Sequence, residues 1–383
     1  MRLDHSIFNE LTDDKIVHKQ EGDISIVANK IIKVGKLASV SQKRKHLAKF
    51  HTLLLTQEYL YYVNRLDKQG SGLIKLSYKA RINIEWLQTN FYTKKTSKAG
   101  ELSYFIEIVK NNKNILFKCE DLKEYESWVL SLSRIAIQTN FKSKYIIKKQ
   151  IGEGATSKVF LVYNIGEEKH FACKKFKKHK LSSKKSLSGL INEIKMLRAL
   201  RGHPNVVGLE EVQETKNSVF LIQEYLEGGK VIEQNKNYEI NDLRIVSISI
   251  LKALSAIHDL GIVHRDLKPG NILLKHKNRP IPQNEIKIID FGISTFLNSK
   301  EDHYKNCGTI GYLAPETFIC QSRVQPTTKS DIYSLGIILY NAFMGMRLFS
   351  FDDEQDAFEA NKRGQIFLDD FEHEFPQNCK LKS

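Results

Sequence analysis

Residues 264–274 read His-Arg-Asp-Leu-Lys-Pro-Gly-Asn-Ile-Leu-Leu, and this stretch decides how the chain is interpreted. A second segment, with apolar Ile286, Ile288 and Ile289, leads directly into Asp-Phe-Gly at 290–292. Two further motifs follow in order, Gly-Thr-Ile-Gly-Tyr-Leu-Ala-Pro-Glu at 308–316 and Asp-Ile-Tyr-Ser-Leu-Gly at 331–336. The order of these motifs, and the residue types within each, argue against a chance arrangement.

Upstream of these motifs lies a glycine-rich turn, residues 151–160, between two strand-like segments. Glycines let a backbone approach phosphate oxygens closely and present N–H groups to them. Lys174 follows on a predicted strand, and Glu193 lies on a predicted helix. Taken alone, the turn fits a purely structural role and the lysine fits an exposed surface charge. Their place ahead of the downstream motifs gives them a common interpretation.

Together these motifs resemble the eukaryotic protein kinase family, of the calmodulin-dependent or second-messenger serine/threonine kind. The resemblance implies a bilobal kinase fold over residues 145–383 and the transfer of a phosphoryl group from ATP, with Mg²⁺, to protein hydroxyls. Lys268, two residues after the catalytic-loop aspartate, is typical of the serine/threonine type. Such transfer depends on positioning and charge neutralisation more than on covalent chemistry.

The resemblance also assigns roles residue by residue. It implies that Asp266 orients the acceptor hydroxyl, that Lys268 steadies the transferring phosphate, and that Asn271 and Asp290 hold the metal. Lys174 would grip the α- and β-phosphates. The residues expected to contact ATP or to orient its ligands are Ile151, Gly152, Gly154, Val159, Ala172, Lys174, Glu193, Glu224 and Leu226. Ser157 stands where the usual third glycine would be.

One departure from the family pattern concerns the C-terminal lobe. In the family this lobe continues with further helices, which include an arginine that pairs with the glutamate equivalent to Glu316. Because the sequence ends at Ser383, we expect the lobe to be incomplete after about residue 375. This leaves an alternative function open, a catalytically weak scaffold or pseudoenzyme that keeps the fold without turnover.

The N-terminal part has a different pattern. Short β-prone segments separated by turns occupy residues 31 to about 117, and an amphipathic helix that contains Trp128 follows. Strands closed by one helix indicate an α+β or capped-barrel module. Residues 31–138 resemble a pleckstrin homology domain, which implies a barrel capped by this helix. Residues 1–30 are predicted to be a flexible lead-in and residues 139–144 a short linker, so that the module is expected to contact the kinase N-lobe.

Pleckstrin homology domains that bind phosphoinositides use basic residues near their first strand. The candidates here are Lys36, Lys43, Arg44, Lys45 and Lys49. His51 occupies the position where the lipid-binding pattern has arginine. Specific headgroup binding, weak attraction to an anionic membrane, and a protein-docking or solvated face all remain open.

Composition sets broader limits. The chain has 383 residues and a net charge of +15, which favours anionic partners, although we expect no nucleic acid. Five scattered cysteines without paired spacing argue for a reducing compartment and against a zinc site. The start of the sequence has no apolar segment of the kind that targets secretion. We therefore expect a cytoplasmic protein, and recruitment to a membrane surface is one of the open roles of its N-terminal module.

Substrate choice can also be predicted from the resemblance. Relatives that select arginine three residues before the acceptor use two carboxylates, at the positions that Lys230 and Gly270 occupy here. Losing both carboxylates predicts no preference for that arginine. Ile293, directly after Asp-Phe-Gly, predicts threonine over serine as the acceptor.

Overall fold

The computed structural model describes residues 21–27, 31–40, 48–56, 59–68, 73–84, 86–95, 102–110, 113–154, 156–233, 236, 238–297, 307–318, 327–349 and 354–363. The chain divides into two compact units. One unit comprises Met1–Leu187 with Gly208–Tyr225, and the other comprises Ser188–Val207 with Leu226–Ser383.

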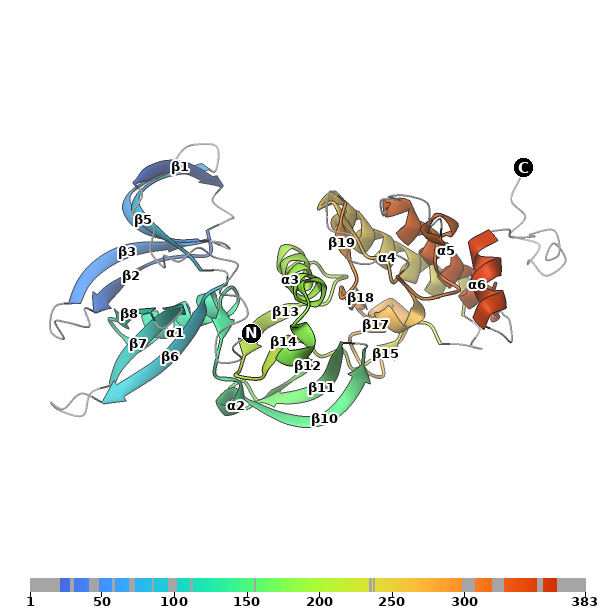
Figure 1. The fold of residues 1–383 in the computed structure, drawn as a ribbon, viewed down its shortest axis with the longest axis horizontal. Helices are drawn as coiled ribbons and strands as arrows, with labels where there is room; N and C mark the ends of the chain where they lie inside the picture. Colours follow the sequence, from blue (N-terminus) through green and yellow to red (C-terminus); the bar gives the residue numbers. More distant parts are fainter. Residues whose placement is uncertain are drawn as a thin grey trace. The chain divides into compact units, whose positions relative to one another are not determined.

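The first unit begins with an antiparallel β module. Its strands are β1 (Gly22–Val27), β2 (Lys33–Val40), β3 (Ala48–Leu55), β4 (Tyr59–Lys68), β5 (Leu73–Asn83), β6 (Gln88–Lys95), β7 (Leu102–Lys110) and β8 (Lys113–Cys119) (Figure 1). Consecutive strands pair within β2–β5 and within β6–β8, and β8 pairs with β2. Residues 22–27, inside the segment predicted to be a flexible lead-in, form β1, whose backbone groups pair with β5.

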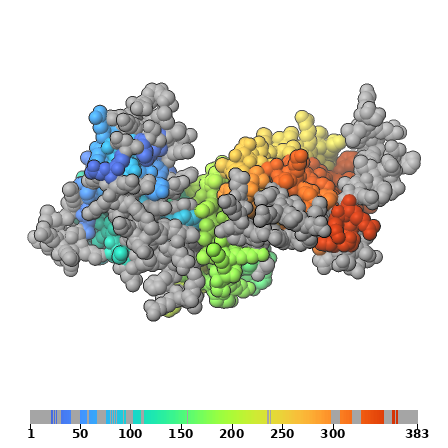
Figure 2. Space-filling model, turned by 45° about the horizontal axis from the view of Figure 1, so that its top comes forward, coloured from blue at the N-terminus to red at the C-terminus, as the bar shows by residue number. Residues whose placement is uncertain are grey.

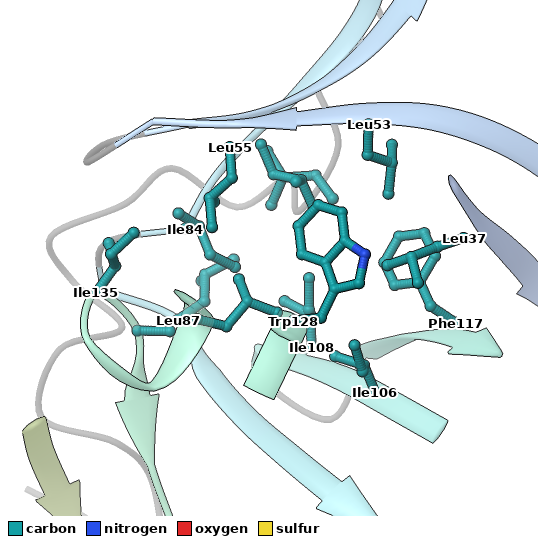
Figure 3. Packing of buried hydrophobic residues seen from close by; sticks show 14 of the residues in the cluster. Leu37, Leu53, Leu55, Ile84, Leu87, Ile106, Ile108, Phe117, Trp128 and Ile135 are labelled. Atoms are coloured by element: carbon teal, nitrogen blue, oxygen red, sulfur yellow. The ribbon is translucent and has the colours of Figure 1, made fainter. Parts of the chain in front are cut away.

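Helix α1 (Leu122–Ser133) packs its tryptophan into the core of this module. Alternation along the strands turns every second side chain inward, and Figure 3 shows Leu53 and Leu55 facing Ile106 and Ile108 with Trp128 between them. All five side chains are fully buried. Burial of so many large apolar groups provides the main stabilisation of the module.

A tight contact fixes α1 against β2. The indole Nε1 of Trp128 donates a hydrogen bond to Glu124 Oε1 at 2.8 Å. Gly35 lies directly beneath this pair, because a Cβ added to it would approach Glu124 Oε1 to 2.2 Å and Trp128 Nε1 to 3.0 Å. Only glycine therefore leaves room for the hydrogen-bonded pair at this point of β2.

Five further strands of the first unit carry the glycine-rich turn and Lys174. They are β10 (Tyr145–Glu153), β11 (Ser157–Asn164), β12 (Lys169–Lys177), β13 (Leu209–Glu214) and β14 (Ser218–Glu224). Their order is β13-β14-β12-β11-β10, with antiparallel neighbours throughout. Strand β13 would be an edge strand in this order, and edge strands leave backbone groups unpaired unless they are covered.

The two-residue strand β9 (Ile137–Gln138) covers that edge. It pairs in parallel with β13 on one side and with β6 of the β module on the other. Residues 139–144, assigned above to a linker, include helix α2 (Phe141–Lys144). The ring of Phe141 is buried and stacks on Phe220 of β14 at 3.9 Å between centroids. This segment is therefore packed onto the sheet instead of forming an extended tether.

The second unit contains most of helix α3 (Lys184–Ala199) and is otherwise built from helices and short strands. These are β15 (Gly229–Lys230), α4 (Ile240–Asp259), β16 (Ile262–Val263), β17 (Ile272–Leu274), β18 (Ile286–Ile288), β19 (Thr295–Phe296), α5 (Thr328–Met344) and α6 (Glu354–Arg363). Helix α4 buries an apolar face and exposes its opposite face to solvent. Part of this outer surface is yellow in Figure 2.

Glu316 accepts a hydrogen bond from Ser330. Within the described residues, no helix is long and apolar enough to cross a membrane.

Candidate active site

A short antiparallel hairpin brings Asn271 and Asp290 to the same end of two strands. Asn271 immediately precedes β17, and Asp290 follows β18 by two residues. Strands β17 and β18 pair with Ile272 opposite Ile288, and the Ile289 amide donates to the Asn271 carbonyl at 3.0 Å. The apolar runs seen in the sequence are therefore the strands that position these two polar side chains.

Asp266 lies at the centre of a hydrogen-bonded cluster. Lys268 Nζ lies 2.8 Å from Asp266 Oδ2, and Asn271 Nδ2 donates to the same oxygen at 3.0 Å. Thr309 Oγ1 donates to the other oxygen, Oδ1, at 2.6 Å, and it accepts from Lys268 Nζ at 2.8 Å. The structure thus brings together three residues that the sequence predicted, and it adds Thr309.

The backbone at this site is held by Asp331, at the start of α5. Its Oδ2 accepts from the His264 amide and its Oδ1 from the Arg265 amide, both at 2.9 Å. Arg265 has φ 71°, in the left-handed region that is costly for a residue with a side chain. His258 Nε2 also contacts Asp331 Oδ2 at 2.9 Å. Asp331 is 1% exposed, so its carboxylate serves as an internal anchor for the loop that presents Asp266.

His264 links the two halves of the site. Its Nδ1 accepts from the Asp266 amide at 3.3 Å, which leaves the ring proton on Nε2 to donate to the Ile289 carbonyl at 3.1 Å. The ring also meets the buried Phe291 edge-on, at 5.1 Å between centroids. Sequence reasoning assigned no role to His264, Asp331 or Thr309, although all three lie inside the quoted motifs.

The residues at the end of the hairpin fit a magnesium ion. Mg²⁺ prefers oxygen ligands and often takes only one or two protein groups, with phosphate oxygens and water completing its shell. The amide nitrogen of Asn271 donates to Asp266, so its oxygen is the atom directed elsewhere. Asp290 supplies a carboxylate and has φ 62°, a conformation that its contact with the Gly292 amide helps to hold.

The candidate nucleotide residues of the first unit lie on the neighbouring strands β10, β11, β12 and β14 and in the turn between β10 and β11. Lys174 of β12 is 8% exposed and lies between Val159 of β11 and Leu221 of β14 in the register. In the turn, the Gly154 amide donates to the Ser157 carbonyl at 2.9 Å, which closes the loop without a third glycine. Gly152 pairs with Val159, and Ala172 lies opposite Gln223. Ile151, by contrast, is 40% exposed.

Other predicted residues have different environments. Glu224 is engaged with Gly208, whose amide donates to Glu224 Oε1 at 2.7 Å and whose carbonyl accepts from the Glu224 amide. Glu193 and Leu226 are both buried and belong to the second unit. The nucleotide-binding roles of this group stay predictions.

Of the predicted anion-binding residues, Lys36 is exposed on β2. Lys43, Arg44, Lys45 and the side chain of Lys49 lie outside the described residues. His51 Nε2 is 3.0 Å from Ser39 Oγ, and its ring meets Tyr62 edge-on. The imidazole is therefore engaged with neighbouring side chains.

Comparison with known proteins fits this geometry. The family model for the protein kinase domain matches residues 145–382. "Probable serine/threonine-protein kinase 2" of Plasmodium falciparum (isolate K1 / Thailand) is 33% identical over 270 residues, 70% of this chain and 51% of that protein. "Ovarian-specific serine/threonine-protein kinase Lok" of Drosophila melanogaster is 31% identical over 259 residues, 65% of this chain and 52% of that protein.

A plant protein shows a similar level of likeness. "Calcium-dependent protein kinase 7" of Oryza sativa subsp. japonica is 32% identical over 230 residues, 59% of this chain and 41% of that protein. The chain thus spans about half the length, or less, of these curated relatives.

Proposed function

Because the chain belongs to the protein kinase family, we propose that it transfers the γ-phosphate of ATP to serine or threonine hydroxyls of proteins. The observation that carries this proposal is the cluster in which Asp266 is held by Lys268, Asn271 and Thr309. A pseudoenzyme has no need of this complete set of polar groups, so the cluster favours turnover over the scaffold alternative.

The cluster suggests a division of roles. Asp266, fixed at both carboxylate oxygens, orients the acceptor hydroxyl and accepts its proton as the phosphoryl group is transferred. Lys268 Nζ, beside Asp266, places a positive charge where the phosphate carries negative charge. Asn271 and Asp290 would hold Mg²⁺, which neutralises charge on the phosphates when bound. Lys174 would bind the α- and β-phosphates.

The test is γ-phosphate transfer by the wild-type chain and by the Asp266→Asn variant to a generic basic protein substrate. Asp259→Asn, at the exposed end of α4, is the matched control for the loss of one carboxylate. We expect transfer by the wild type and the control, and a loss of about 100-fold or more in the Asp266 variant. Equal signals from the wild type and the Asp266 variant would overturn the proposal.

For the acceptor we propose threonine in a sequence not led by arginine. Lys230 is exposed on β15, and Gly270 offers no carboxylate beside the catalytic loop. An arginine of a substrate peptide would meet a like charge at the first position and no partner at the second. The β-branched Ile293 supports threonine over serine.

We further propose that residues 31–138 form a pleckstrin homology-like module that positions or regulates the kinase domain, in a cytoplasmic protein recruited to membrane surfaces. Seven antiparallel strands, β2 to β8, closed by the Trp128 helix support this likeness. Lys36 is a candidate contact for an anionic lipid. Sedimentation with phosphoinositide vesicles, compared with phosphatidylserine vesicles of equal charge and with the Lys36→Glu variant, tests the lipid site. Specific headgroup binding would be contradicted if the wild type sedimented equally with both kinds of vesicle and the Lys36→Glu variant sedimented equally with phosphoinositide vesicles.

A further inference from the structure

Glu214, at the end of β13, has a buried carboxylate whose two oxygens contact two different parts of the first unit. Glu214 Oε1 pairs with Lys178 Nζ at 2.9 Å, and the two side chains are 1% and 3% exposed. Glu214 Oε2 accepts a hydrogen bond from Gln88 Nε2 at 3.0 Å. Gln88 is the first residue of β6, in the β module, whereas Glu214 ends β13 and Lys178 directly follows β12, the strand of Lys174.

This contact is one of several buried hydrogen bonds between polar side chains near β9. Gln138 Nε2 donates to Thr89 Oγ1 at 2.8 Å, and both residues are almost fully buried. On the other side, Gln213 Nε2 donates to Asn140 Oδ1 at 2.9 Å, and Gln213 is also buried. Buried polar groups are costly unless they are hydrogen-bonded, so these partners fix one arrangement of the β module against β13.

Lys178 is close to the predicted ATP ligand along the chain. It directly follows β12, the strand that carries Lys174, and its amide donates to the Asn217 carbonyl at 3.0 Å. A strand is an extended backbone, and β12 is hydrogen-bonded to β11 and to β14, so one regular segment joins Lys178 to Lys174. The four-residue step from Lys178 to Lys174 spans roughly 13 Å in such a strand.

We propose that Gln88, Glu214 and Lys178 are positioning residues through which the β module sets the ATP-binding geometry of Lys174. The proposal rests on the proposed kinase function. Without the Gln88 amide, Glu214 Oε2 would lose that hydrogen bond, and the carboxylate would be held less firmly in its present orientation. Lys178 would follow because its charge is buried against the same group. The end of β12 would then move, and Lys174 with it.

The test uses the full chain with Gln88→Met, which keeps the length of the side chain and removes the donor. Thr93→Val, at an exposed position of the same strand, is the matched control. We expect the KM for ATP and the dissociation constant for a fluorescent ADP analogue to rise about fivefold or more in the Gln88 variant. The KM for the protein acceptor should stay within about twofold. The control should match the wild type in every measurement.

A second pair of variants separates positioning from mere stability. Lys178→Met should show the same loss of nucleotide affinity as Gln88→Met. Lys178→Arg keeps the charge beside Glu214 and should retain most of the wild-type nucleotide affinity. Lower melting temperatures with unchanged nucleotide affinity would overturn the proposal, as would equal affinities for wild type and Gln88→Met.

The ADP measurement does not depend on catalysis, so the two proposals fail separately. A wild-type chain that transfers no phosphate, but whose nucleotide affinity falls in the Gln88 variant, would contradict only the kinase function.

Discussion

Thr309 Oγ1 donates a hydrogen bond to Asp266 Oδ1 at 2.6 Å, although the two residues are 43 positions apart in the sequence. The same hydroxyl accepts from Lys268 Nζ, which itself contacts the second oxygen of Asp266. The three side chains form a closed ring in which each fixes the other two. The hydroxyl of Thr309 therefore holds Asp266 and Lys268 in a fixed position relative to each other.

Thr309→Val is expected to lower kcat about 10- to 100-fold, because an isosteric side chain without the hydroxyl leaves Asp266 and Lys268 free to reorient. Thr309→Ser keeps the hydroxyl and should retain activity within a few-fold of the wild type. Steady-state kinetics on both variants, with melting temperatures to verify folding, would check this. Comparable kcat values for the valine and serine variants would show that the hydroxyl is dispensable.

The double substitution Lys230→Glu with Gly270→Glu should create a preference for arginine three residues before the acceptor. A Cβ at Gly270 would find its nearest atom, Lys268 Cε, at 3.8 Å, so the site can take a side chain. Two carboxylates offer the charged partners that arginine pairs with. An oriented peptide library phosphorylated by both proteins measures the change. Strong selection of arginine by the wild type would contradict the underlying reasoning.

Gly35→Ala should lower the free energy of unfolding of the β module by about 1–3 kcal/mol. The added methyl group would overlap Glu124 Oε1 and crowd Trp128 Nε1, so the hydrogen bond between α1 residues must break or α1 must shift. Denaturant unfolding followed by tryptophan fluorescence measures this loss. Gly166→Ala is a suitable control, because a Cβ there has its nearest contact at 3.7 Å. Equal losses in both variants would argue against a specific clash.

Because of the buried Tyr145 hydroxyl, the free energy of unfolding should decrease at alkaline pH. Burial, followed by the nearby charge and hydrogen bond of Glu211, raises the pKa of Tyr145 well above its ordinary value of 10.0. The folded chain therefore keeps a proton that the unfolded chain releases. This contribution is fully present below pH 10 and is lost as the pH rises further, by about 1.4 kcal/mol per pH unit.

Tyr145→Phe should cost about 1 kcal/mol at pH 7, because Glu211 loses one of its hydrogen bonds. The same variant should show a flatter decline in stability above pH 10 than the wild type. Denaturant unfolding at pH values from 7 to about 11 provides the comparison, with Tyr163→Phe on β11 as the control. Parallel curves for the wild type and Tyr145→Phe would contradict the prediction.

The amino-acid sequence alone identified Asp266, Lys268 and Asn271 as one group, because they lie within six residues of one another and local chain geometry keeps them together. It also determined the alternating strands and the helix that buries Trp128, since residue period and side-chain size set which face is apolar. Only the tertiary structure placed Thr309 on Asp266, Asp331 beneath the catalytic loop, and Gln88 on Glu214. These contacts join residues 43, 66 and 126 positions apart. No local pattern encodes such pairs, because they arise when separate elements pack and buried polar groups must find partners.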